Sequence, residues 1–258
     1  MLDADVQLLS LAASAGVMFV TWLVSLRAED ASLADISWGL CFVAVSWVCL
    51  LVGPEAGDRS LLIAVLVSLW GLRLAGYVAW RHDGEDRRYQ VMRKRQGSAF
   101  AIRSLFTVFL LQALIAWVVS APIQVAATDG SPAALGVLGF IGAAVCLLGL
   151  ACEAVADLQL ARFLAEPDSG DKVMDRGLWG WSRHPNYFGD ATFWWGIFLI
   201  ALATGSAWWT AIGPIVMTTF LLKVSGVALT EKTISSRRPG YAEYVERTSA
   251  FIPLPPKR

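Results

Sequence analysis

Long apolar runs dominate the pattern of hydrophobic and polar positions along this chain of 258 residues. Seven runs approach or exceed the roughly 20 residues that an α-helix needs to cross a bilayer. We therefore predict an all-α integral membrane bundle of seven transmembrane helices that forms a single transmembrane domain over residues 1–258. The expected helices cover residues 6–26, 33–52, 60–80, 104–123, 133–163, 187–204 and 208–230.

Composition agrees with a membrane protein. Hydrophobic residues make up 56% of the chain and charged residues 16%, whereas soluble proteins carry about 25% charged residues. The formal net charge is zero, which gives no electrostatic reason to expect a nucleic-acid partner. The four cysteines form no CxxC pair and there are two histidines, so we expect no metal site.

The basic residues predict the orientation. Four segments, 27–32, 81–103, 162–186 and 223–258, alternate onto one side of the predicted bundle. They hold all of the 21 lysines and arginines except Arg59 and Arg73. Because cytoplasmic loops are enriched in these residues, we expect the N-terminus outside and the C-terminus in the cytoplasm. The first five residues carry no lysine or arginine, so we expect the first helix to be retained and not cleaved as a signal peptide.

Ionisable residues inside the apolar runs all fall in the cytoplasmic half of this topology. Buried charges of this kind usually pair or line a hydrated cavity, which predicts a polar pocket open to the cytoplasm. The alternative is that residues near helix ends extend to the interface. The six residues are Asp35, Arg73, Glu153, Asp157, Asp190 and Lys223.

Some of these ionisable residues belong to two groups that recur at helical spacing. Glu153 and Asp157 are four residues apart and share one face. Two carboxylates so placed repel each other unless cations or the hydroxyls of a ligand bind them, and the candidate cations are Arg162, Arg176 and Arg183. Another face carries Trp70, Arg73, Tyr77 and Arg81, for which an aromatic belt at the membrane interface is the alternative.

The segment 81–103 is rich in arginine and contains Arg87, Arg88 and Tyr89. Arginine forks suit phosphate groups. The alternative is the ordinary cytoplasmic excess of basic residues, in contact with anionic lipid.

A dense polar motif begins the sixth helix: Arg183, His184, Pro185, Asn186 and Tyr187, followed by Asp190. Such polarity at a bilayer boundary destabilises the fold unless it is satisfied. Asn186 offers donors and an acceptor that could pair with a carboxamide, and free amides at the helix start favour an anion. A plain helix start would account for Pro185 and Asn186 alone.

Residues 177–190 resemble the signature of membrane sterol reductases and steroid 5-alpha-reductases. The shared pattern is Gly-x-Trp-Gly-x-x-Arg-His-x-Asn-Tyr-x-Gly-Asp, and the ending Arg238-Pro239-Gly240-Tyr241-x-x-Tyr244 fits it as well. The full-length pattern, including Asp35-x-x-Trp38 and Arg87-Arg88-Tyr89, resembles that of bacterial proteins of unknown function grouped with the 5-alpha-reductases. The resemblance implies a bacterial inner-membrane protein, with its specific motifs in residues 153–253.

The resemblance also implies an activity. It implies NADPH held among the cytoplasmic halves of the C-terminal helices, and hydride transfer to the β carbon of a hydrophobic enone such as a 3-oxo-Δ4-steroid. Reduction of an enone places negative charge on the carbonyl oxygen, which an acid or hydroxyl must meet. In the family, an acid on the second helix and a tyrosine on the third do this.

The expected residues follow from the resemblance and the patterns above. The catalytic candidates are Asp35 and Tyr77, because Trp70 stands where the family has its tyrosine. The substrate-binding candidates are Asp35, Trp38, Trp70 and Tyr77. The cofactor-binding candidates are Arg73, Arg87, Arg88, Tyr89, Glu153, Asp157, Arg162, Arg176, Arg183, His184, Asn186, Tyr187, Asp190, Arg238, Tyr241 and Tyr244.

A second family shares part of the motif. Isoprenylcysteine and phospholipid methyltransferases also place Arg-His-Pro-x-Tyr-x-Gly at a helix start, and they bind S-adenosylmethionine. In that reading, Glu231 and the pair Tyr241 and Tyr244 would serve this cofactor. The third class is a lipid-binding or structural membrane protein without turnover.

Overall fold

The structure is a computed structural model that describes residues 3–129, 134–167, 169–224 and 239–257. All regular elements in these ranges are helical, and one isolated bridge joins Ser182 to Ser249, so the all-α prediction is confirmed. The chain divides into two compact units. The first holds residues 1–139 and 200–213, and the second holds 140–199 and 214–258.

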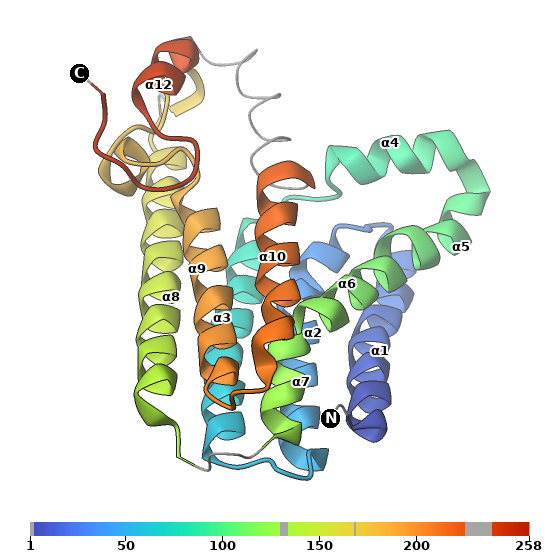
Figure 1. The fold of residues 1–258 in the computed structure, drawn as a ribbon. Helices are drawn as coiled ribbons and strands as arrows, with labels where there is room; N and C mark the ends of the chain where they lie inside the picture. The colour runs from blue at the N-terminus through green and yellow to red at the C-terminus, as the bar shows by residue number, and fades with distance from the viewer. Residues whose placement is uncertain (1–2, 130–133, 168, 225–238, 258) are drawn as a thin grey trace. The chain divides into compact units, whose positions relative to one another are not determined.

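Three long helices form the core of the first unit: α1 (Ala4–Ala28), α2 (Leu33–Val52) and α3 (Asp58–Arg81) (Figure 1). The expected bounds of α2 are confirmed without change. The α2 and α3 backbones approach closely at two glycines, since a Cβ at Gly39 would lie 2.6 Å from the carbonyl oxygen of Gly71. Small residues allow such contacts between membrane helices.

The chain after α3 differs from the expected loop and single helix. Segment 81–103, predicted as a loop, contains α4 (Arg87–Gln96) and α5 (Phe100–Ser104). Asp86 caps α4 by accepting a hydrogen bond from the backbone N–H of Arg88 at 2.8 Å. The sequence analysis did not recognise Asp86 as the N-cap of a helix. The helical path continues through a π-helical stretch at Leu105–Leu110 and then α6 (Leu111–Val119).

Helix α7 (Ala121–Thr128) follows directly, within a segment expected to lie partly outside the membrane. Pro122 stands in its first turn, where the missing N–H costs nothing because the first turn has no intrahelical partner for it. The expected helix 104–123 is therefore one part of a longer, interrupted helical path.

The second unit contains α12 (Tyr241–Arg247) and most of three other helices, α8 (Gly136–Leu164), α9 (Pro185–Leu202) and α10 (Ile212–Thr219). Glycines again set the packing. A Cβ at Gly149 on α8 would lie 2.5 Å from the backbone nitrogen of Phe193 on α9. Helices α8 and α9 therefore lie side by side with their backbones in contact, as Figure 1 shows.

Six described helical segments are long and apolar enough to cross a membrane, which supports a multi-pass membrane protein. Helix α9, expected as a further span, is not among them because its first turns carry Asn186 and Asp190. The count of seven spans and the orientation of the termini stay predictions. The six segments are Ala4–Ala28, Leu33–Val52, Asp58–Arg81, Arg87–Val119, Gly136–Leu164 and Ala207–Val224.

Candidate functional site

Helices α8 and α9 bring together the acids and the amide that the sequence singled out. Glu153 and Asp157 on α8 are each 3% exposed, and Asp190 on α9 is also buried. The side-chain nitrogen of Asn186 donates a hydrogen bond to Oδ1 of Asp157 at 3.1 Å. Gly189 makes this approach possible, because a Cβ there would lie 2.5 Å from the backbone nitrogen of Glu153.

The start of α9 is held in one conformation by local contacts. The rings of His184 and Tyr187 stack in parallel with centroids 5.5 Å apart. The backbone N–H of His184 donates to Oγ of Ser182 at 3.1 Å, and Ser182 Oγ–H donates to the carbonyl of Phe251 at 2.7 Å. The predicted clamp at residues 183–187 is thus an ordered, buried to half-buried helix start.

Two of the expected cofactor residues bind the backbone of the chain. The guanidinium of Arg183 donates to the carbonyls of Val245 and Thr248 at 3.0 and 2.9 Å, at the C-terminal end of α12, where helix carbonyls lack partners and favour a cation. The hydroxyl of Tyr244 donates to the carbonyl of Trp179 at 2.6 Å. Burial raises the pKa of the Tyr244 phenol. These contacts join α12 to the segment that precedes α9.

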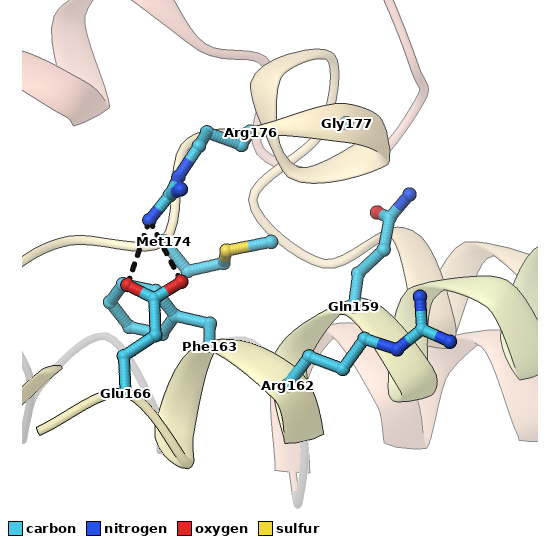
Figure 2. A pocket seen from close by; sticks show the side chains of 7 residues that line it. All are labelled: Gln159, Arg162, Phe163, Glu166, Met174, Arg176 and Gly177. Carbon is cyan, nitrogen blue, oxygen red and sulfur yellow. Dashed lines mark hydrogen bonds and ion pairs between the residues drawn. The ribbon is translucent and has the colours of Figure 1, made fainter.

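A pocket of about 210 Å³ lies at the C-terminal end of α8 (Figure 2). The guanidinium of Arg176 donates to both carboxylate oxygens of Glu166 at 3.1 and 3.3 Å, and it lies over the ring of Phe163 at 5.9 Å. Figure 2 shows Arg162 and Gln159 on the other side of the pocket from this pair. The lining residues are Gln159, Arg162, Phe163, Glu166, Met174, Arg176 and Gly177.

The sequence singled out the two arginines of this pocket and Gly177, the first residue of the 177–190 motif, and missed its other residues. Positions 159, 162 and 163 recur at helical spacing and form one face of α8, so periodicity was a usable signal for them, whereas Glu166 lies just beyond the end of α8. Met174 lies on the segment after α8 and carried no such signal.

In the first unit, Asp35 on α2 is bound by two residues of α4. The hydroxyl of Tyr89 donates to Oδ1 of Asp35 at 3.0 Å, and Nη2 of Arg88 donates to Oδ2 at 3.0 Å. The amide of Gln112 lies 3.5 Å from the Tyr89 oxygen. The hydroxyl of Tyr77, in contrast, accepts a hydrogen bond from Arg81 at 3.2 Å. The structure therefore brings Tyr89 to Asp35, a pairing that sequence reasoning did not predict.

The acids interleaved in segment 81–103 have a structural role. The carboxylate of Glu85 accepts from the backbone N–H of Ala31 at 3.0 Å and from Arg93 at 2.7 and 3.1 Å. His82 and Asp30 form a pair at 2.6 Å. These contacts tie the segment before α4 to the loop between α1 and α2.

Asp86 adds another tie, because its backbone N–H donates to Oγ of Ser32 at 2.6 Å. Burial alone would raise the pKa of its carboxyl. Hydrogen bonds from the Arg88 side chain and backbone, together with the positive charge of that guanidinium, outweigh burial and lower the pKa of Asp86.

The remaining expected residues have the following places. Trp38 and Trp70 both pack on Phe42, with ring centroids 5.2 and 5.5 Å away, and Trp70 has no exposed surface. Arg73 lies over the ring of Tyr77 at 5.9 Å. Arg87 is exposed on α4, Tyr241 is buried beside Tyr244, and Arg238 lies outside the described residues.

Among the described residues, no group of three or more His, Cys, Asp or Glu side chains is placed so that it could hold a metal ion.

Comparisons with known proteins give a family and a relative. The family model described as "Protein of unknown function (DUF1295)" matches residues 21–248. A protein of Schizosaccharomyces pombe, described as uncharacterized, is 26% identical over 269 aligned residues that cover 91% of this chain and 76% of the relative. No solved structure matches the chain.

Proposed function

We propose that this chain, which belongs to the family described as "Protein of unknown function (DUF1295)", is an NADPH-dependent membrane reductase. The substrate would be a hydrophobic enone, such as a 3-oxo-Δ4-steroid, that receives a hydride at its β carbon. In this proposal α9 is a seventh span, the N-terminus lies outside, and the site faces the cytoplasm of a bacterial inner membrane. The one-sided distribution of basic residues supports this orientation.

The hydrogen bond from Asn186 to Asp157 carries the proposal. It joins the motif that resembles sterol reductases to a buried acid of α8, with Glu153 one turn away on the same face. Burying two carboxylates in a membrane helix is unfavourable without polar partners. Carboxylates accept hydrogen bonds from ribose hydroxyls, and a carboxamide such as Asn186 can pair with the carboxamide of nicotinamide.

The pocket at the end of α8 supports a ligand of elongated shape. Its volume of about 210 Å³ is below the ~300 Å³ typical of sites that enclose a whole ligand, so it suits one end of a larger molecule. Arg162 offers a guanidinium that fits a phosphate. Glu153 and Arg162 stand roughly 14 Å apart along the helix axis, so an extended molecule is needed to reach both.

The chain also offers a group for the second half of the reaction. When bound, NADPH supplies the hydride. The negative charge that then develops on the carbonyl oxygen needs a donor in a dry site. The Tyr89 side chain is 7% exposed and its hydroxyl is held by Asp35. If this hydroxyl turns toward a substrate oxygen, Arg88 still neutralises Asp35, because it bonds the other carboxylate oxygen.

The alternative reading is a methyltransferase that binds S-adenosylmethionine. It would use the tail tyrosines, yet the hydroxyl of Tyr244 is engaged by the carbonyl of Trp179. Glu231, its other expected residue, lies outside the described residues. The same contact counts equally against a cofactor role for Tyr244 in the reductase, so the preference for the reductase rests on the hydrogen bond between Asn186 and Asp157, two residues that the methyltransferase motif does not assign.

Ligand-induced stabilisation tests the proposal. Purified full-length protein would be heated with NADPH, NADH or S-adenosylmethionine. We expect NADPH to raise the melting temperature most, because a ligand that binds only the folded state stabilises it. Stabilisation by S-adenosylmethionine alone would overturn the proposal in favour of the methyltransferase.

Two variants locate the site. Asn186→Ala should abolish the effect of NADPH, since it removes the amide that links the two helices. The matched deletion Gln7→Ala removes an amide from α1 and should leave the effect intact. Circular dichroism checks that both variants are folded. If Asn186→Ala is folded and retains the full NADPH effect, Asn186 is not part of the site.

A further inference from the structure

Helix α4 has two faces of different character. Its inner face carries Tyr89, Met92, Arg93 and Gln96, which are buried or half-buried. Its outer face carries Arg87, Val91, Lys94 and Arg95, which are all exposed and recur at the spacing of one helical face. The helix runs crosswise to α1 and α2 of the same unit, as Figure 1 shows.

The cations of the inner side are neutralised within the protein. Arg93 makes two hydrogen bonds to the carboxylate of Glu85, and Arg88 contacts both Asp35 and Asp86. These arginines satisfy acids of the chain and hold α4 in place. The contacts that hold α4 in place therefore come from its inner side and do not involve the outer face.

The cations of the outer face are not neutralised by acids of the chain in this way. Within the described part of the chain, Arg87, Lys94 and Arg95 make no hydrogen bond or ion pair through their side chains. They form a patch of three positive charges on an ordered helix. An ordered cluster of uncompensated cations attracts a polyanionic surface.

The neighbouring surface indicates which polyanion this is. Large apolar side chains follow α4 closely: Ile102 is 67% exposed and Phe106 is 61% exposed. The segment Arg87–Val119 is one of the candidate membrane spans. A cationic segment followed along the chain by exposed apolar side chains is the pattern expected where a helix passes from the lipid headgroups to the acyl chains.

We propose that the face formed by Arg87, Val91, Lys94 and Arg95 is a docking surface for the anionic headgroups of the surrounding membrane. The cations contact headgroup phosphates, and Val91 adds an apolar contact at the same level. The inner-face ties then connect this lipid contact to Asp35 through Tyr89 and Arg88. This inference is independent of the proposed reductase activity, because it rests on the outer face alone.

The test measures lipid preference in the purified full-length protein. Dioctanoyl phosphatidylglycerol and dioctanoyl phosphatidylcholine would be titrated into protein in a neutral detergent, and bound lipid would be counted by native mass spectrometry. We expect a preference for phosphatidylglycerol that weakens as salt is raised, because salt screens exposed charges. At about 1 kcal/mol for each basic residue, removal of one cation should weaken binding roughly fivefold.

Three variants make the test specific. Arg87→Gln/Lys94→Gln/Arg95→Gln should lower affinity for phosphatidylglycerol on the order of 100-fold, and glutamine preserves helix propensity. Arg87→Lys/Arg95→Lys keeps the charge and should keep the preference. The control Arg27→Gln/Lys172→Gln/Lys257→Gln removes three exposed cations from elsewhere and should also keep it.

Several results would overturn the inference. One is a folded triple glutamine variant of α4 that retains the preference. Another is an equal loss in the control variant, which would indicate a general charge effect. A third is retained lipid preference together with lost stabilisation by NADPH, which would assign these cations to a nucleotide phosphate.

Discussion

The contact between α8 and α9 at Gly189 gives the sharpest prediction about this protein. A methyl group at this position would lie 2.5 Å from the nitrogen of Glu153, 2.7 Å from the carbonyl oxygen of Gly149 and 2.9 Å from the Cα of Glu153. These are backbone atoms and cannot rotate away. Against the 3.4 Å of an ordinary contact, the shortest distance falls short by about 0.9 Å, so Gly189→Ala must push the two helices apart.

The size of the effect follows from this separation. Overpacking of a well-packed interface destabilises by about 1–3 kcal/mol. The hydrogen bond from Asn186 to Asp157 is 3.1 Å long, and a shift of this size would break it, at about 0.5–1.5 kcal/mol. Alanine recovers about 0.5–1 kcal/mol through helix propensity. We expect a net loss of about 2 kcal/mol, or roughly 4–8 °C in melting temperature.

The assay is thermal unfolding of the purified protein, followed by tryptophan fluorescence with and without NADPH. Gly189→Ala should lower the melting temperature and reduce stabilisation by NADPH. Gly16→Ala on α1 is the matched control, because no atom lies within 4 Å of its Cβ position, and it should be neutral or slightly stabilising. A melting temperature for Gly189→Ala equal to that of the wild type would refute the packing argument.

Three further predictions concern single side chains. Tyr89→Phe should leave stabilisation by NADPH intact and slow enone reduction by about 100-fold or more, as expected for loss of a general acid. Tyr77→Phe should have little effect, and the reverse order would restore Tyr77 as the catalytic tyrosine. Arg162→Gln should weaken NADPH more than NADH, since a guanidinium recognises the additional phosphate, and equal weakening of both would remove that role. Burial raises the pKa of Tyr244 above that of an unfolded tyrosine, near 10, so its contribution to stability should be complete below about pH 10 and decline at higher pH. Tyr244→Phe should lower the melting temperature at neutral pH and lose this alkaline decline, and identical pH curves for the two proteins would contradict the assignment.

The sequence by itself determined the class of the fold. In a bilayer, each apolar segment must satisfy its backbone within one helix, so run length and turn residues were enough to predict α2 with its bounds unchanged. The polar motif at the start of α9 and the paired acids of α8 were also visible, because charge inside an apolar run is costly and therefore informative.

The tertiary structure decided which of these residues meet. Asp35 is bound by Tyr89, a contact that the sequence did not predict, because the hydrogen bonds of Glu85 and Asp86 to the loop before α2 hold α4 next to it. The guanidinium of Arg183 caps α12, which lies about sixty residues further along the chain. Helical periodicity places residues on a face of one element, but the partner of a polar group depends on the path of distant segments.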